Sequence, residues 1–248
     1  MYYYYAMDIL EKRFIELADR AEERCYVTFS DFLNMEEKSL LETLKLNTEY
    51  CFFGGYDMAE RCVAAFGYGC ESAEFPITII KAEPVSPKFA DKLSHRDFLG
   101  SLMGLGIKRE VVGDIVIADN IGYIFCLKSI AEYIAQSFDK VRHTNVKCSM
   151  IDELPETAQS APEEKQLIAA SERLDVIVAA VYGFSRSEVK EFFVNRRVFV
   201  NSAQCENFSR IPKAGDIISV RGKGRFVYNG VLGNTKKNRL IISVGIYR

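Results

Sequence analysis

The densest group of functional side chains in this sequence is positively charged, and it lies in the last third of the chain. Arg186 and Lys190 lie four residues apart in a segment with helical spacing, so they share one face of the expected helix. Arg196 and Arg197 follow, directly before the alternating segment 198–201. Clustered guanidinium and ammonium groups neutralise phosphate oxygens, which is the chemistry of a nucleic-acid-binding surface. The alternative interpretation is a solvated basic face without a ligand.

A second basic segment reads Arg221-Gly222-Lys223-Gly224-Arg225. Glycines without a Cβ allow the backbone to approach an anion closely, and three cations attract one. The alternative is a hairpin turn whose basic residues are merely exposed. Both interpretations place a turn here.

The charge of the whole chain is distributed unevenly. Residues 1–162 contain 17 Lys and Arg against 26 Asp and Glu, whereas residues 163–248 contain 15 against 8. The net charge of −2 over 248 residues is therefore made of an acidic part and a basic part. Such an asymmetry predicts a localised anion-binding module. A composition of 48% hydrophobic and 27% charged residues is that of a globular protein and excludes a wholly disordered chain.

The elements that must position these cations are indicated by capping and turn signals. Ser171 is expected to cap a first helix that ends at Gly183. Residues 185–188 match a capping box at the start of a second helix. Strands are expected at 198–201 and 217–221, the second one after a turn that contains proline and glycine.

This segment resembles the S4 RNA-binding domain in the order and spacing of its residues. The matches are Arg173-Leu174-Asp175, Ser185-Arg186, Arg197 with 198–201, and Gly215-Asp216-Ile217-Ile218. The sequence departs from the family at Asn195-Arg196-Arg197, where a glycine turn is frequent. The RNA-binding residues that charge and resemblance together predict are Arg173, Ser185, Arg186, Lys190, Arg196, Arg197, Asn201, Arg221, Lys223 and Arg225. Asp175 is expected to be a structural partner of a nearby arginine.

The middle of the chain has the order β-α-β-β-α-β, the ferredoxin-like plan that many RNA-recognition (RRM) domains share. The expected strands are 75–82, 114–118, 122–127 and 141–148, and the expected helices are 94–105 and 128–137. Asp119 and Asn120 are expected to form the turn between the second and third strands. Tyr123 and Phe125 share one strand face, so they are available for base stacking unless a helix buries them.

The chain as a whole is expected to be a multidomain α+β protein. Helical spacing over 8–23 and 34–46, followed by two short extended segments, predicts a small N-terminal domain at 1–72. An RRM-like RNA-binding domain is expected at 73–150 and an S4 domain with a C-terminal β extension at 166–248. Residues 151–165 are rich in proline and acidic groups and coincide with the charge switch, which predicts a linker.

Three middle segments strengthen the comparison with known families. The segments Ser94 to Gly100, Gly104 to Arg109 and Gly113-Asp114, together with the S4 pattern, resemble the bacterial YlmH family over essentially the full length. The resemblance implies a cytoplasmic, ribosome-associated, non-catalytic protein. It also implies binding to ribosomal RNA of the large subunit and to tRNA or peptidyl-tRNA, in rescue and quality control of stalled translation.

A second RNA-facing patch is expected at the ends of the first middle-domain helix. Its residues are His95, Arg96, Lys108 and Arg109. The competing interpretation is local capping and ion pairing with Asp97, Glu110 or Asp114. Spacing alone does not choose between the two.

Enzyme motifs and metal sites are not indicated. His95-Arg96-Asp97 mimics a kinase catalytic loop, but the required Asn does not follow and no phosphate-binding loop is present. Seven cysteines without a CxxC pair and only two histidines predict reduced thiols rather than a metal site. No apolar run approaches the roughly 20 residues of a membrane span. We therefore expect a monomer that binds no cofactor, no DNA and no membrane.

Two alternatives remain at this point. S4 modules also target RNA-modifying enzymes to their substrates, so an enzyme with such a module is the first. The second is a protein-interaction adaptor, for example in cell division, in which the acidic N-terminal domain is the active part.

Overall fold

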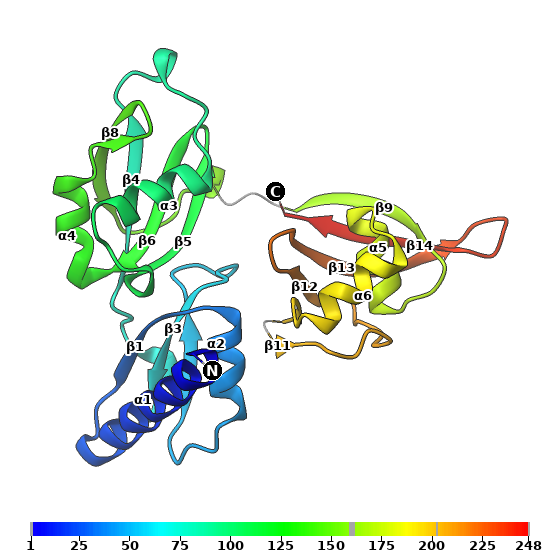
Figure 1. The fold of residues 1–248 in the computed structure, drawn as a ribbon, viewed down its shortest axis with the longest axis horizontal. Helices are drawn as coiled ribbons and strands as arrows, with labels where there is room; N and C mark the ends of the chain where they lie inside the picture. The colour runs from blue at the N-terminus through cyan, green and yellow to red at the C-terminus, as the bar shows by residue number, and fades with distance from the viewer. Residues whose placement is uncertain (1, 159–161, 202, 248) are drawn as a thin grey trace. The chain divides into compact units, whose positions relative to one another are not determined.

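A computed structural model describes residues 2–158, 162–201 and 203–247, with side chains described from residue 7 onward. The chain forms two compact units, residues 1–159 and 160–248. Six α-helices and three antiparallel sheets occur within the described residues, which confirms a mixed α/β protein (Figure 1). No helix in this part of the chain is long and apolar enough to cross a membrane.

The first unit begins with two helices packed on a three-stranded sheet. The elements are α1 Tyr2–Arg24, β1 Thr28–Leu33, α2 Met35–Thr43, β2 Tyr50–Phe53, β3 Cys62–Phe66 and the 3-10 turn η1 Cys70–Ser72. Phe14, Leu17 and Ala21 recur at helical spacing in α1 and are buried against Phe66 of the central strand β3. Strand β1 was not expected from the sequence.

The same unit continues into a five-stranded sheet of order β5-β6-β4-β8-β7. Its elements are β4 Ile77–Pro84, η2 Pro87–Phe89, α3 His95–Gly104, η3 Arg109–Val111, β5 Val112–Ala118, β6 Ile121–Leu127, α4 Lys128–Ser137, β7 Lys140–Val141, β8 Thr144–Ile151 and η4 Glu156–Ala158. The expected β-α-β-β-α-β order is therefore present. Phe98 and Ile134 of the two helices pack on Ile80 and Ile124 of the central strands. Asp119 and Asn120, with φ of 50° and 63°, form the expected turn.

One expectation for this region was wrong. The strand expected at 141–148 is a hairpin of β7 and β8, because Arg142 adopts a φ of 55° and reverses the chain. The boundary between the two units falls within the expected linker 151–165, whose ends belong to β8 and to β9 Glu163–Ala169. Strand β9 pairs with β14 along its whole length. Backbone hydrogen bonds need no apolar side chains, so an acidic segment can still form a strand.

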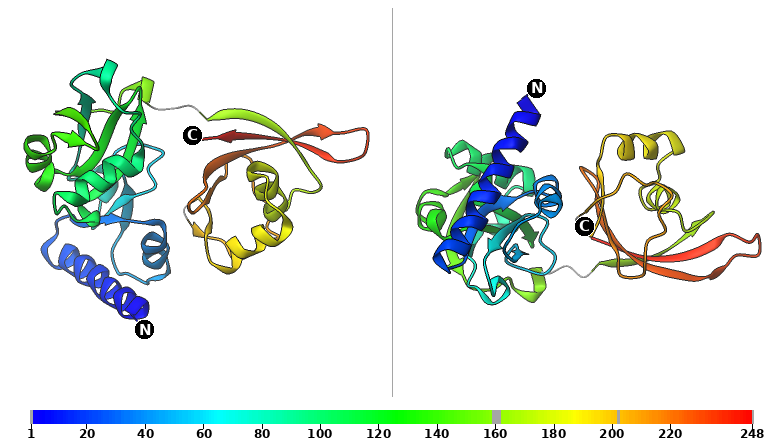
Figure 2. Two further views of the ribbon diagram at one scale, coloured as in Figure 1. Left: turned by 45° about the horizontal axis from the view of Figure 1, so that its top comes forward. Right: turned by 90° about the horizontal axis from the view of Figure 1, so that it is seen from below.

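The second unit is a six-stranded sheet of order β11-β10-β12-β13-β14-β9 with two helices on one face (Figure 2). Its remaining elements are α5 Leu174–Tyr182, α6 Arg186–Val194, β10 Val198–Val200, β11 Ala203–Gln204, β12 Ile217–Val220, β13 Gly224–Asn234 and β14 Leu240–Ile246. Ile177 and Phe193 of the helices pack with Ile218 and Phe226 of the sheet.

Helix α5 begins later than expected. Arg173, not Ser171, precedes its first residue, because the first N–H groups of the helix find partners in a distant loop. The N–H of Leu174 donates to the carbonyl of Arg210 at 2.8 Å. Gly183 ends the helix with a φ of 71°, as expected.

The face of the middle sheet that carries no helices is covered by the N-terminal sheet of the same unit. Phe32 of β1 and Val63 of β3 form one buried cluster with Tyr123 and Phe125 of β6. The approach is close, because a Cβ on Gly113 would lie 2.5 Å from the ring of Phe32. Large apolar side chains from two sheets therefore form a single core here.

Asp114 joins the two sheets by hydrogen bonds. Its carboxylate accepts the hydroxyl of Tyr56 at 3.0 Å and the backbone N–H groups of Glu60 and Arg61 at 2.7 and 3.1 Å. The Arg61 guanidinium donates to the carbonyls of Phe32 at 2.8 Å and Val112 at 3.1 Å. Burial lowers the pKa of Arg61, and the carboxylates around it, Asp114 among them, act in the opposite direction.

We predict that Asp114→Ala destabilises the first unit by about 2–4 kcal/mol, because three donors lose a charged acceptor. Urea denaturation followed by circular dichroism measures the change. Asp31→Ala, at an exposed aspartate of β1, is the control. Equal stability of the two variants would contradict this role for Asp114.

Candidate nucleic-acid interface

The start of helix α6 is held by the predicted capping box. The Ser185 Oγ accepts the N–H of Glu188 at 3.3 Å, and the Glu188 carboxylate accepts the N–H of Ser185 at 2.8 Å. Ser185 thus acts within the helix cap. Arg186 and Lys190 follow on the exposed surface, and their side chains make no hydrogen bond or ion pair with any described residue. Their charges are available to a ligand.

A stack of aromatic rings supports the other basic side chains. Phe184 and Phe192 stack at 5.0 Å between ring centroids and an angle of 16°. The Lys223 ammonium lies 5.2 Å from the Phe184 centroid, and the Arg197 guanidinium lies 4.8 Å from the Phe192 centroid. Cation–π attraction holds both cations at the edge of the core. We call these two cations, together with the neighbouring Arg221, the ring-backed cluster.

The glycine-containing segment 221–225 consists of the turn 221–223 between β12 and β13 and the first two residues of β13. Gly222 and Gly224 have φ of 80° and 114°, which glycine adopts without strain. The Arg197 guanidinium donates to the carbonyl of Arg221 at 2.7 Å, and a Cβ on Gly222 would lie 2.9 Å from the same guanidinium. The turn that both interpretations expect is therefore present. The turn also brings Arg221 and Lys223 beside Arg197.

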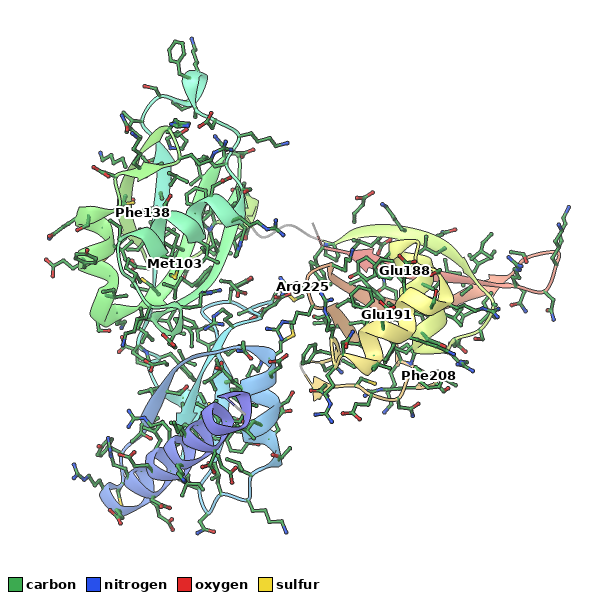
Figure 3. The ribbon with its side chains drawn as sticks, viewed as in Figure 1. Met103, Phe138, Glu188, Glu191, Phe208 and Arg225 are labelled. Atoms are coloured by element: carbon green, nitrogen blue, oxygen red, sulfur yellow. The ribbon has the colours of Figure 1, made fainter. Side chains whose placement is uncertain are left out.

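The expected basic residues do not form a single row on α6. With about 100° per residue, Arg186 and Lys190 share one flank of the helix, whereas Glu188 and Phe192 lie on another. The ring-backed cluster belongs to the Phe192 flank. Figure 3 labels Glu188 and Glu191 along this helix. The cations are thus divided into two groups by carboxylates, which sequence spacing alone did not indicate.

The other predicted residues have structural partners. Arg173 forms a two-point ion pair with Asp175, at 2.8 and 3.1 Å, as expected for that aspartate. Arg196 pairs with Glu206 at 3.0 Å. With a φ of 55°, Arg196 also adopts the left-handed conformation for which glycine is frequent in the family.

Asn201 and Arg225 complete the set. The Asn201 side chain donates to Asp216 at 2.8 Å and accepts the N–H of Ile217 at 2.8 Å, so it joins two strands. The Arg225 guanidinium lies 5.1 Å from the centroid of the Tyr247 ring. Asn201 therefore holds the end of β10 against the start of β12 by hydrogen bonds.

The aromatic pair expected on the middle sheet is buried. Tyr123 is 5% exposed and Phe125 is fully buried, both under the N-terminal sheet. Burial is therefore confirmed, but a sheet covers the pair and not the helix that the alternative expected. Base stacking on this sheet face is excluded in this arrangement.

The second expected patch is also divided. Arg109 is turned inward, donating to the carbonyl of Gly113 at 2.9 Å, and burial and Arg61 lower its pKa to about 10. Burial and the nearby Arg109 lower the pKa of His95. Arg96 and Lys108 are exposed. For Arg109 the structure thus favours the capping interpretation.

Other candidate sites are few in the described part of the chain. No group of three or more His, Cys, Asp or Glu side chains there is arranged to hold a metal ion, and all seven cysteines are free thiols. A groove of about 890 Å³ in the first unit is lined by acidic residues, among them Glu71, Asp152 and Glu153. Its charge disfavours phosphate, so it is not a candidate RNA site.

One comparison with known proteins, the match to a family model, agrees with a nucleic-acid role. Residues 70–154 match the family model described as "Putative RNA-binding domain in YlmH". The Bacillus subtilis (strain 168) protein named "Ribosome-associated protein quality control protein P2" is 29% identical over 230 residues, covering 88% of this chain and 86% of that protein. The solved structure titled "Cell division protein ylmH from Streptococcus pneumoniae" covers 58% of this chain and 90% of its own chain, with 19% identity and a TM-score of 0.48.

We predict that Tyr123→Leu lowers the thermal stability of the protein but leaves its affinity for RNA unchanged, because the ring lies in a core. Thermal denaturation and fluorescence anisotropy with a labelled RNA measure the two effects. A variant of unchanged stability that loses RNA affinity would contradict the burial argument.

A pH dependence follows from the α6 cap. Its bonds to Ser185 hold the pKa of Glu188 below the ordinary value near 4.5, so this stabilisation is complete above that value and is lost as the pH falls through the folded pKa. Glu188→Gln is therefore expected to be less stable than the wild type at about pH 7, and the difference should shrink as the pH falls below the ordinary glutamate value near 4.5. Urea midpoints over a pH series test this. Glu191→Gln, on the same helix outside the cap, is the control.

Proposed function

We propose a function for this chain from its similarity to the YlmH proteins, which its domain match and its Bacillus relative support. The chain is a non-catalytic RNA-binding protein that acts on the ribosome in quality control of stalled translation. Its RNA partners are ribosomal RNA of the large subunit and tRNA or peptidyl-tRNA. It acts in the cytoplasm as a monomer.

The observation that carries this proposal is the ring-backed cluster of Arg197, Arg221 and Lys223. Two of these cations are held over aromatic rings from different elements, so they lose little freedom when they meet phosphate. Arg186 adds a charge at the first residue of α6. Such fixed positive charge suits the phosphates and 2′-hydroxyls that A-form RNA displays.

The element order of the second unit supports an S4 assignment. Helices α5 and α6 are followed by β10 and β12, and the matching residues fall at the expected positions of these elements. We assign residues 166–248 to an S4 domain with a β extension, in which β13, β14 and β9 extend the sheet.

The strand order β5-β6-β4-β8 supports an RRM-like domain in residues 73–150. Its sheet face is closed by the N-terminal domain, residues 1–72. RNA recognition by this domain therefore uses a surface other than the open sheet.

We predict that Arg186→Gln with Lys223→Gln weakens binding to the large ribosomal subunit and lowers the slope of log K against log salt by about one unit per lost phosphate contact. Both side chains are exposed, so the fold should persist. Sedimentation with purified subunits over a salt series, with and without bound tRNA, measures the effect.

The matched control is Arg24→Gln with Lys45→Gln, which removes two exposed cations from the acidic unit. An unchanged affinity and slope in the folded Arg186 and Lys223 variant would overturn the proposed surface. Failure of the wild type to bind either subunit would overturn the ribosomal role.

A further inference from the structure

One segment of the middle domain displays a large aromatic ring that no fold requirement explains. Between β4 and α3 the chain projects beyond the sheet and forms the short turn η2 (Figure 1). Phe89, its last residue, is 90% exposed, and Val85 is 63% exposed. The Phe89 ring gains no free energy from burial. Single exposed rings are common on protein surfaces, so the groups around this ring decide whether it marks a binding site.

The segment is held in place by hydrogen bonds at both ends. The N–H of Val85 donates to the carbonyl of Asn145 at 2.9 Å, and the N–H of Asp91 donates to the Thr144 hydroxyl at 2.9 Å. Asn120 adds a further anchor, because its side chain donates to the carbonyl of Asp91 at 2.8 Å. The Phe89 ring therefore projects from a turn that is held in place by hydrogen bonds.

Positive charge surrounds this turn. Lys88 and Lys92 flank Phe89 in the sequence and are exposed, and neither makes an ion pair with a described residue. The anchors to Asn145 and Thr144 bring the turn beside the β7–β8 hairpin, whose exposed cations are Lys140, Arg142 and Lys147.

The carboxylates near these cations are fewer than the cations, and one of them has its own partner. The one carboxylate within residues 85–96 is Asp91, and one of its oxygens is buried. On the hairpin side, Asp97 lies 3.7 Å from Arg142, and Asp139 is exposed beside Lys140. Glu83 of β4 stands opposite Lys147 in the strand register, but its carboxylate pairs with Lys81 at 2.7 Å.

We propose that Lys88, Phe89, Lys92, Lys140, Arg142 and Lys147 form a binding surface for unpaired RNA. The Phe89 ring stacks on an exposed base, and the surrounding cations contact the adjoining phosphates. The inference deepens the proposed function, on which it rests, because it gives the middle domain an RNA contact outside its closed sheet face. An aromatic ring between cations is the arrangement by which proteins hold single strands without reading their sequence.

The ligand is a single strand because a base inside a duplex offers no free face to the Phe89 ring. A duplex of the same length would meet only the cations. The two RNA forms therefore separate the contribution of the ring from that of the charge.

The test uses the full-length chain and a short fluorescent oligouridine, with a duplex of equal length for comparison. Fluorescence anisotropy is expected to show that Phe89→Ala weakens single-strand binding by at least about fivefold, as loss of one base–aromatic stack requires. Duplex binding should change little. Phe89→Tyr, which keeps a ring, should restore the affinity.

The matched control is Tyr68→Ala, which removes a ring that is 91% exposed in the same unit. Unchanged single-strand binding by Phe89→Ala would overturn the inference, and so would a loss of ribosome binding without a loss of RNA binding, which would indicate a protein partner. If only the Arg186 and Lys223 variant loses affinity for RNA, the proposed function stands and the Phe89 surface is overturned. If neither that variant nor Phe89→Ala loses affinity, the proposed function and the Phe89 surface are both overturned.

Discussion

The organisation of the first unit depends on the contact between two sheets, with Asp114 at its centre. The carboxylate lies where the edge strand of the middle sheet meets the chain from the N-terminal sheet, and it accepts three hydrogen bonds there. Beside it, the Arg61 guanidinium satisfies carbonyls of both sheets. The two half-buried charges of Asp114 and Arg61 cost desolvation free energy, which their hydrogen bonds offset. Because the two sheets are joined in this way, one face of the middle sheet becomes part of the core.

That consequence decides where RNA can bind. In an RRM-like sheet the aromatic residues of a central strand are open to bases, whereas here Tyr123 and Phe125 are buried with Phe32 and Val63. Among the exposed cations of the middle domain are those at the β7–β8 edge and the adjoining turn, outside this core. In the second unit, exposed cations on α6 and on the turn after β12 form the candidate interface.

Aromatic rings act as supports for cations in the second unit. Phe184 and Phe192 belong to the helical layer, but their outer faces hold Lys223 and Arg197. Each such contact stabilises by about 0.5–1 kcal/mol at an exposed site. Its larger effect is to restrict long side chains before a ligand arrives, which reduces the entropy lost on binding.

The sequence by itself determined what depends on neighbours along the chain. The capping box at Ser185, the helix end at Gly183, the turn at Asp119-Asn120 and the order of strands and helices in the middle domain all follow from local hydrogen bonds and periodicity. Only the tertiary structure decided which faces are covered. Burial of Tyr123, the inward turn of Arg109, the strand at 163–169 and the division of the basic residues on α6 depend on residues distant in sequence. The type of a residue determines which interactions its side chain can make. The packing of separate elements determines which of these interactions form.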